Sequence, residues 1–153
     1  MKKELITLVF AFVVVAAVSA QSPLRSKEFN LDKGLAVQGY DPVAYFTEGR
    51  AVKGTRDFSA TVDGVVYYFA NPGDKDTFLK DWKKYEPQYG GWCAYAMGAT
   101  GGKVEIDPGT FKIIDGKLYL FYNKFFNNTL KSWNKDQSNL KQKADANWQK
   151  FNH

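Results

Sequence analysis

Hydrophobic and polar positions alternate in two separate parts of the chain, and an Asp-Gly pair interrupts each alternating run. The first run is DFSATVDGVVYYFAN and the second is TFKIIDGKLYLFYN. A period of two indicates strands with one buried face, and Asp-Gly tolerates the positive φ angles of a tight hairpin turn. We therefore predict strands at about 56–62 and 65–70, and a second hairpin around Asp115-Gly116.

Apolar residues recur at helical spacing after each hairpin and again near the C-terminus. Asn71-Pro72 has the sequence of a helix cap and first turn, which predicts a helix over about 72–84. Asn123 precedes a second apolar stripe, which predicts a helix over about 124–134, and a third stripe predicts a terminal amphipathic helix over about 138–150. The repeated order of hairpin and helix indicates either an internal duplication or two copies of a common local solution.

These elements predict an α+β domain of antiparallel β-hairpins packed against three to four helices. Asp41 and Pro42 predict a further short helix that ends near Gly49. Residues 21–38 are interpreted as an N-terminal lead-in, and the domain itself as residues 39–151.

The first twenty residues have the three parts of a secretory signal peptide. Lys2 and Lys3 precede an apolar run from Leu5 to Ala17, and small residues follow as far as Ala20. The apolar run is shorter than a membrane span. We therefore predict cleavage after Ala20 and a soluble mature protein, without a membrane span, in the bacterial periplasm or outside the cell.

Positive charge is concentrated toward the C-terminus. The chain has a formal net charge of +5, and residues 121–153 hold six basic and two acidic side chains. A basic end is typical of proteins that bind nucleic acid or anionic lipid. Export argues against nucleic acid, and the lysines are spaced as on the wet side of amphipathic helices, so we favour a solvated face.

Several short sequence motifs occur in the order that is typical of one protein family. GYDPVAYF, VDGVVYYFAN and FLKDWKKY resemble the YHS domain family over residues 39–85, and PQYGGWCAYAMG, IDGKLYLFYNK and KADANW extend the resemblance to the exported, longer branch of that family as far as Trp148. The resemblance implies a YHS-like fold. It also implies an association with metal, because the thiols of the better-known YHS pattern are thought to bind metal.

Those thiols are absent from this chain. The family pattern has cysteines in DPVCGM and YYFCS and another four residues later, whereas this sequence has Ala44, Ala70 and Asp74 at these positions. The family's metal site therefore cannot be carried over. Some members of the longer branch are described as selenoproteins with selenocysteine at the position of Cys93, which implies a chalcogen that reacts or coordinates there.

Cys93 is the only cysteine in the chain. Gly90-Gly91 can break the chain, and the following residues can form a short helix with Cys93 in its first turn, where backbone N–H groups favour a thiolate. Met97 lies four residues later on the same face, and thiolate with thioether is the pairing that selects Cu(I). The sequence thus predicts a copper-like site of Cys93 and Met97, which the terminal His153 or other polar side chains would have to complete.

Aromatic side chains are abundant near the cysteine and near the first short helix. They can line a small-ligand pocket with polar tips, although a place in the core and its rim is the simpler interpretation. The residues predicted for this pocket are Tyr89, Trp92, Tyr95, Tyr40 and Asp41.

Three functions remain open at this point. The first is an exported binding module that holds a soft metal ion or a small ligand near Cys93. The second is a thiol-dependent oxidoreductase with Cys93 as its catalytic residue, although the chain offers no second cysteine for a disulfide cycle. The third is a structural or interaction domain in which Cys93 is inert.

Overall fold

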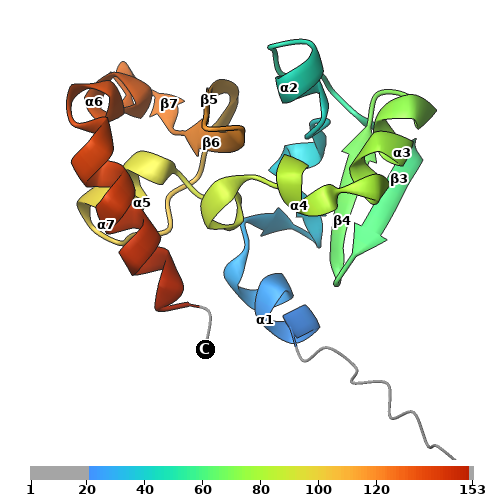
Figure 1. Cartoon of the computed structure of the whole chain (residues 1–153), viewed down its shortest axis with the longest axis horizontal. Helices are drawn as coiled ribbons and strands as arrows, with labels where there is room; N and C mark the ends of the chain where they lie inside the picture. The colour runs from blue at the N-terminus through green and yellow to red at the C-terminus, as the bar shows by residue number, and fades with distance from the viewer. Residues whose placement is uncertain (1–20, 152–153) are drawn as a thin grey trace, which may run out of the picture.

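Two β-hairpins organise the computed structural model, one at the right edge and one near the middle of the view in Figure 1. Strand β3 (Thr55–Val62) pairs antiparallel with β4 (Val65–Phe69), and β5 (Asp107–Ile114) pairs antiparallel with β6 (Lys117–Phe121). Both predicted hairpins and the α+β class are confirmed. The structure describes residues 21–151, so the predicted signal peptide and His153 lie outside the described residues.

The segment before residue 39 joins the first hairpin. Helix α1 (Gln21–Glu28) leads into β1 (Leu31–Asp32) and β2 (Leu35–Ala36), and β2 runs parallel to β4. The result is a four-stranded mixed sheet in the order β1-β2-β4-β3. Residues 21–38, predicted as a lead-in, thus supply two strands of the sheet.

The helices of the first half follow the predicted signals, with one interruption. The short helices are η1 (Val37–Gly39) and α2 (Ala44–Thr47), and α3 (Pro72–Lys80) is followed by α4 (Trp82–Tyr85). The Asn71 side chain caps α3 as predicted, because its Oδ1 accepts from the backbone N–H of Asp74 at 2.8 Å. The single helix predicted over 72–84 is broken at Asp81, whose φ of −153° and ψ of 61° are not helical.

The second half contains a hairpin where a helix was predicted. Its helices are η2 (Gln88–Gly91), α5 (Ala94–Ala99), α6 (Thr129–Lys135) and α7 (Gln137–Gln149). The helix predicted over 124–134 starts later, because β7 (Asn123–Lys124) and β8 (Asn127–Asn128) pair first. Asn128, and not Asn123, caps α6 by accepting from the N–H of Leu130 at 3.1 Å.

The two large hairpins share the same pairing and the same irregularity. In the first hairpin, the register shifts between the pairs Thr55↔Phe69 and Ser59↔Tyr68. In the second hairpin, it shifts between the pairs Asp107↔Phe121 and Phe111↔Leu120. In each half, two helices also come after the hairpin and meet at an aspartate with non-helical backbone angles, Asp81 or Asp136. Among the described residues of the first half, the β7-β8 hairpin has no counterpart.

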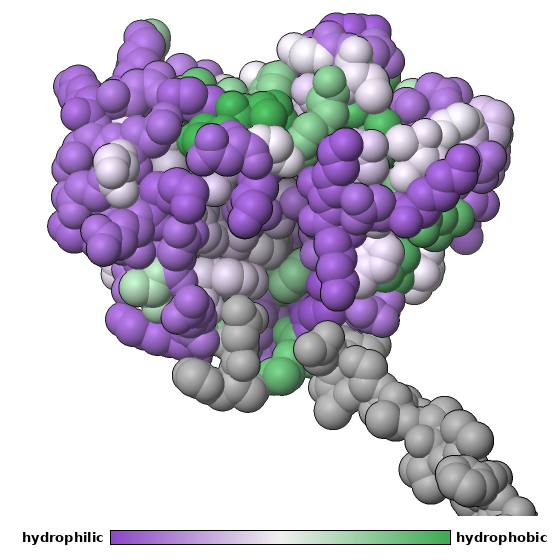
Figure 2. Space-filling view, viewed as in Figure 1, coloured by the Kyte–Doolittle hydropathy of each residue, from purple (hydrophilic) through white to green (hydrophobic). Residues whose placement is uncertain are grey.

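The core consists of two hydrophobic clusters that meet between the halves. The first cluster surrounds β4, α2 and α3, and its fully buried members include Tyr45, Tyr67, Phe69 and Phe78. The second cluster joins β6 to α5, α6 and α7, and it includes Tyr119, Phe121 and Trp133. Figure 2 shows a mainly hydrophilic surface on this side, with hydrophobic side chains gathered where β5 and β6 face α2. Within residues 21–151, no helix has the length and apolar character needed to cross a bilayer.

Candidate functional site

Cys93 follows a turn in which three consecutive residues have positive φ. The φ angles of Tyr89, Gly90 and Gly91 are 56°, 59° and 84°. Gly90 is required here because a Cβ at this position would come within 2.8 Å of the side chains of Phe29 and Trp148. This turn brings Cys93 to the start of α5 as its N-cap residue, one position before the first turn in which it was predicted.

The sulfur of Cys93 is fully buried and has polar partners on both sides. Its Sγ accepts a hydrogen bond from the backbone N–H of Tyr122 at 3.4 Å and lies 3.4 Å from Thr129 Oγ1. The Thr129 hydroxyl donates to Tyr122 O at 2.9 Å, so its own proton is already used. The S–H group of Cys93 therefore donates to Thr129, and both hydrogen-bonding functions of the thiol are satisfied inside the protein.

Met97 is also fully buried, but its side chain packs in a different place. Cys93 belongs to the first cluster, whereas Met97 belongs to the second, where it packs with residues such as Trp133 and Leu140. The two residues are joined through their backbone groups, by a hydrogen bond from Met97 N to Cys93 O at 3.0 Å. Among the described residues, no group of three or more His, Cys, Asp or Glu side chains is arranged to hold a metal ion.

Two of the residues predicted to line an aromatic pocket, Tyr89 and Trp92, pack in the second hydrophobic cluster. The Tyr89 hydroxyl donates to Asp145 Oδ1 at 2.8 Å, and burial together with this bond raises the pKa of Tyr89. Trp92 Nε1 donates to the backbone carbonyl of Glu28 at 2.7 Å.

Tyr95 shares this cluster, and the other two pocket candidates lie in the first half. Tyr95 packs against both hydrophobic clusters, and the Tyr40 ring lies 4.6 Å from Lys53 Nζ. Asp41 belongs to a separate polar network. None of the five predicted pocket residues lines either of the two cavities found among the described residues.

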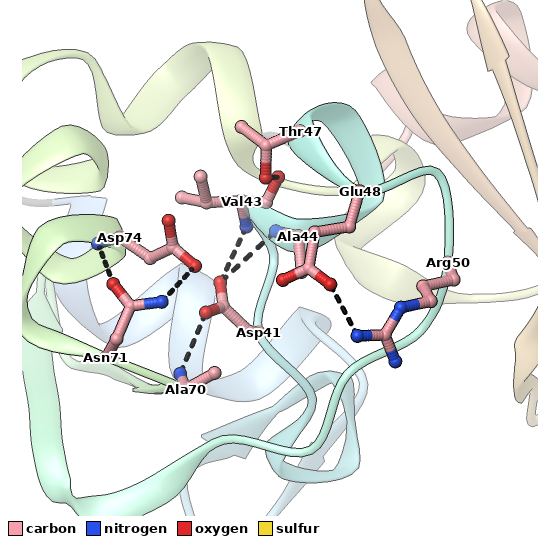
Figure 3. A network of polar contacts seen from close by, with 9 residues as sticks. All are labelled: Asp41, Val43, Ala44, Thr47, Glu48, Arg50, Ala70, Asn71 and Asp74. Atoms are coloured by element: carbon pink, nitrogen blue, oxygen red, sulfur yellow. Dashed lines mark hydrogen bonds and ion pairs between the residues drawn. The ribbon is translucent and has the colours of Figure 1, made fainter.

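Asp41 is the buried centre of a polar network in the first half (Figure 3). Its Oδ1 accepts from the N–H groups of Val43 at 2.8 Å and Ala44 at 3.4 Å, which holds the turn that leads into α2, although the N-cap residue is Val43 and not Asp41 as predicted. Its Oδ2 accepts from the N–H of Ala70 at 2.8 Å. One carboxyl group thus ties the loop before α2 to the end of β4.

The same network gathers the three positions that carry thiols in the YHS pattern. Ala44 and Ala70 donate backbone hydrogen bonds to Asp41, and the Asp74 side chain interacts with the Asp41 carboxyl group. Burial and the neighbouring Asp74 raise the pKa of Asp41 to about 6, although the bonds from Ala70 and Val43 act in the opposite direction. At the three positions where the family pattern has sulfur, the chain thus has two methyl groups and one carboxyl group, and this carboxyl group faces Asp41.

Two cavities open at surfaces that the sequence did not indicate. One, of about 410 Å³, is lined by Leu24, Arg25, Glu28, Phe29, Glu86, Trp148 and Phe151. The other, of about 550 Å³, is lined by Asn30, Leu31, Asp32, Gln38, Lys53 and Glu105. Neither lining includes Cys93, Met97 or Asp41.

Paired charges form one wall of the first cavity. Arg25 makes a two-pronged ion pair with Glu86, and the Tyr67 hydroxyl donates to the same carboxylate. The Arg25 guanidinium also lies 4.6 Å from the Phe29 ring and 4.8 Å from the Trp82 ring. These partners fix α1 to the body of the protein. No local sequence signal marked the contact, because Arg25 and Glu86 are far apart in the chain.

Searches with this chain found no matching family model, no matching curated protein and no matching solved structure.

Proposed function

We propose that this chain is an exported, YHS-like, non-catalytic interaction domain in which Cys93 is an inert part of the core. The observation that carries the proposal is the state of the Cys93 sulfur, which is fully buried and engaged by Tyr122 and Thr129. A nucleophile must reach its substrate, and a metal ligand needs a free lone pair directed at the ion. The Cys93 sulfur meets neither requirement in this arrangement.

Two geometric features support the YHS-like part of the proposal. The positions of the three family thiols, now Ala44, Ala70 and Asp74, all contact one residue, as expected if they descend from a shared site. The equal pairing and the shared register shift of the two hairpins support a duplicated hairpin-helix unit.

The two other functions have less support. A copper-like site would need Cys93 and Met97 to direct their sulfur atoms at one ion, but both side chains are buried in different clusters. A thiol-dependent oxidoreductase would need Cys93 to meet an external thiol or oxidant, since no second cysteine is present. Both of these functions require the start of α5, where Cys93 lies, to move away from β6 and α6.

Titration with Cu(I) under reducing conditions tests the proposal against the metal-binding alternative. We expect the wild-type protein and the Cys93→Ser variant to take up copper equally weakly, because Cys93 is not a ligand. A second variant, Met97→Leu, tests the other predicted ligand, because it keeps the apolar volume and removes the thioether. Stoichiometric binding by the wild-type protein that is lost in both variants would contradict the proposal. Circular dichroism of each variant establishes that a loss does not come from unfolding.

A further inference from the structure

The turn between β7 and β8 exposes two adjacent phenylalanines. Phe125 and Phe126 are 87% and 112% exposed, whereas the next most exposed large hydrophobic residue of the described chain, Leu79, is 47% exposed. Figure 1 places β7 beside α6, at the top of the second half in this view. The two aromatic rings therefore project from the body of the protein and contribute no burial to its core.

The backbone of this turn is also unfavourable for phenylalanine. Phe125 and Phe126 have φ angles of 52° and 63°, in the left-handed region that bulky residues rarely adopt. The other three hairpin turns use the same pair of positive φ angles but have glycine second, in Lys33-Gly34, Asp63-Gly64 and Asp115-Gly116. The β7-β8 turn thus has phenylalanine at a position where glycine would adopt the backbone angles more easily and would expose less apolar surface.

The fold does not need this hairpin to connect its second sheet to its helices. In the first half, Asn71 caps α3 directly after β4. In the second half, the β7-β8 hairpin intervenes between β6 and the cap of α6 at Asn128. A segment that is extra, strained and apolar at its tip is explained by a contact outside the chain.

The charge of the neighbouring lysines and the small apolar area of the turn favour a lipid surface as the partner. Lys124 in β7 and Lys131 in the first turn of α6 are exposed, and neither takes part in an ion pair of the described residues. Two phenylalanines bury roughly 400 Å² together, about half of what each partner contributes to a standard protein interface. A bilayer needs no complementary partner surface, and basic side chains beside inserted aromatic rings match anionic headgroups.

We propose that the β7-β8 turn is a membrane-docking loop. Phe125 and Phe126 enter the interfacial region of a bilayer, and Lys124 and Lys131 meet its anionic headgroups. The inference deepens the proposed interaction function, on which it rests, by naming the partner. It changes the interpretation of the basic C-terminal part from a solvated face to a lipid-facing one near this hairpin.

Sedimentation with phospholipid vesicles tests the loop directly. The protein should lack residues 1–20, because their apolar run would itself bind lipid, and every described element lies after them. We expect binding to vesicles that contain about one-third phosphatidylglycerol. The variant Phe125→Asn with Phe126→Gly keeps a favourable turn sequence, and it should bind about tenfold more weakly or less.

Matched controls distinguish this contact from non-specific hydrophobic adsorption to the vesicles. Leu79→Ser removes the next most exposed hydrophobic residue on the other half and should leave vesicle binding unchanged. High salt or pure phosphatidylcholine vesicles should weaken binding by the wild-type protein. Equal binding by the turn variant, or concentration-dependent self-association without vesicle binding, would overturn the proposal. A failed copper titration would instead concern Cys93, so the two proposals can fail separately.

Discussion

The buried carboxyl group of Asp41 predicts that the protein becomes more stable as the solution is made mildly acidic. Burial, with the nearby Asp74, raises the pKa of Asp41 from its ordinary value of 3.8 to about 6. A group whose pKa is higher in the folded state binds protons more readily there than in the unfolded chain. Its contribution to stability is fully present below about pH 4 and is lost as the pH rises through 6.

The size of the effect follows from the same two pKa values. Between pH 7 and pH 5, protonation of Asp41 should raise the free energy of unfolding by about 1.3 kcal/mol. The Glu28 carboxyl group does not contribute in this pH range. The hydrogen bond from Lys103 lowers the pKa of Glu28, so stability from that pair is lost only below the ordinary Glu value of 4.5.

Urea unfolding at several pH values between 5 and 7 measures the slope. The wild-type protein should gain about 1.3 kcal/mol toward pH 5, and Asp41→Asn should lose this gain whatever its absolute stability. Asp74→Asn should reduce the gain only in part, because burial is the larger cause of the shift. Asp76→Asn, on the exposed side of the same helix, is the matched control. An unchanged slope in Asp41→Asn would refute the reasoning.

Two further substitutions test the packing and the ion pairs by urea and thermal unfolding. Gly98→Ala should destabilise the protein by about 2 kcal/mol or more, because its Cβ would lie 2.4 Å from Leu140 O, and α5 and α7 would have to separate. A loss near zero would show that these helices are loosely packed. Glu86→Ala should cost about 3 kcal/mol, since it leaves the largely buried Arg25 unpaired, whereas Glu48→Ala removes an exposed pair and should cost less than about 1 kcal/mol. Equal losses in these two variants would contradict the assigned difference.

Local signals in the sequence predicted the hairpins well, because each signal and its consequence lie within a few residues. Asp63-Gly64 and Asp115-Gly116 fix their turns by backbone preference alone, and Asn71 caps the helix that follows it. The prediction of a helix that begins at residue 124 was wrong, because the local pattern was misleading at this place. The spacing of Phe126 fits a helical stripe, and no local rule predicts that two phenylalanines occupy a tight turn.

The candidate site depended on contacts between distant segments, which the sequence pattern does not contain. Cys93 had the residue type and glycine neighbours of a reactive thiol, but its environment is set by Tyr122 and Thr129 from the second half. The pairing of Asp41 with Asp74 likewise joins a loop to a helix that follows the first hairpin. In both cases the surroundings of the residue come from the tertiary fold.

The alkylation rate of Cys93 in the folded protein is the most direct test of the central claim that this thiol is an inert core residue. The rate should be measured at pH 6 and pH 7 with a small neutral reagent, and compared with the rate for the same chain unfolded in urea. Because the reagent can reach the sulfur only when α5 opens from β6 and α6, we predict that the folded protein reacts at least about a hundredfold more slowly. A folded-state rate equal to or faster than that of the unfolded chain would contradict the account.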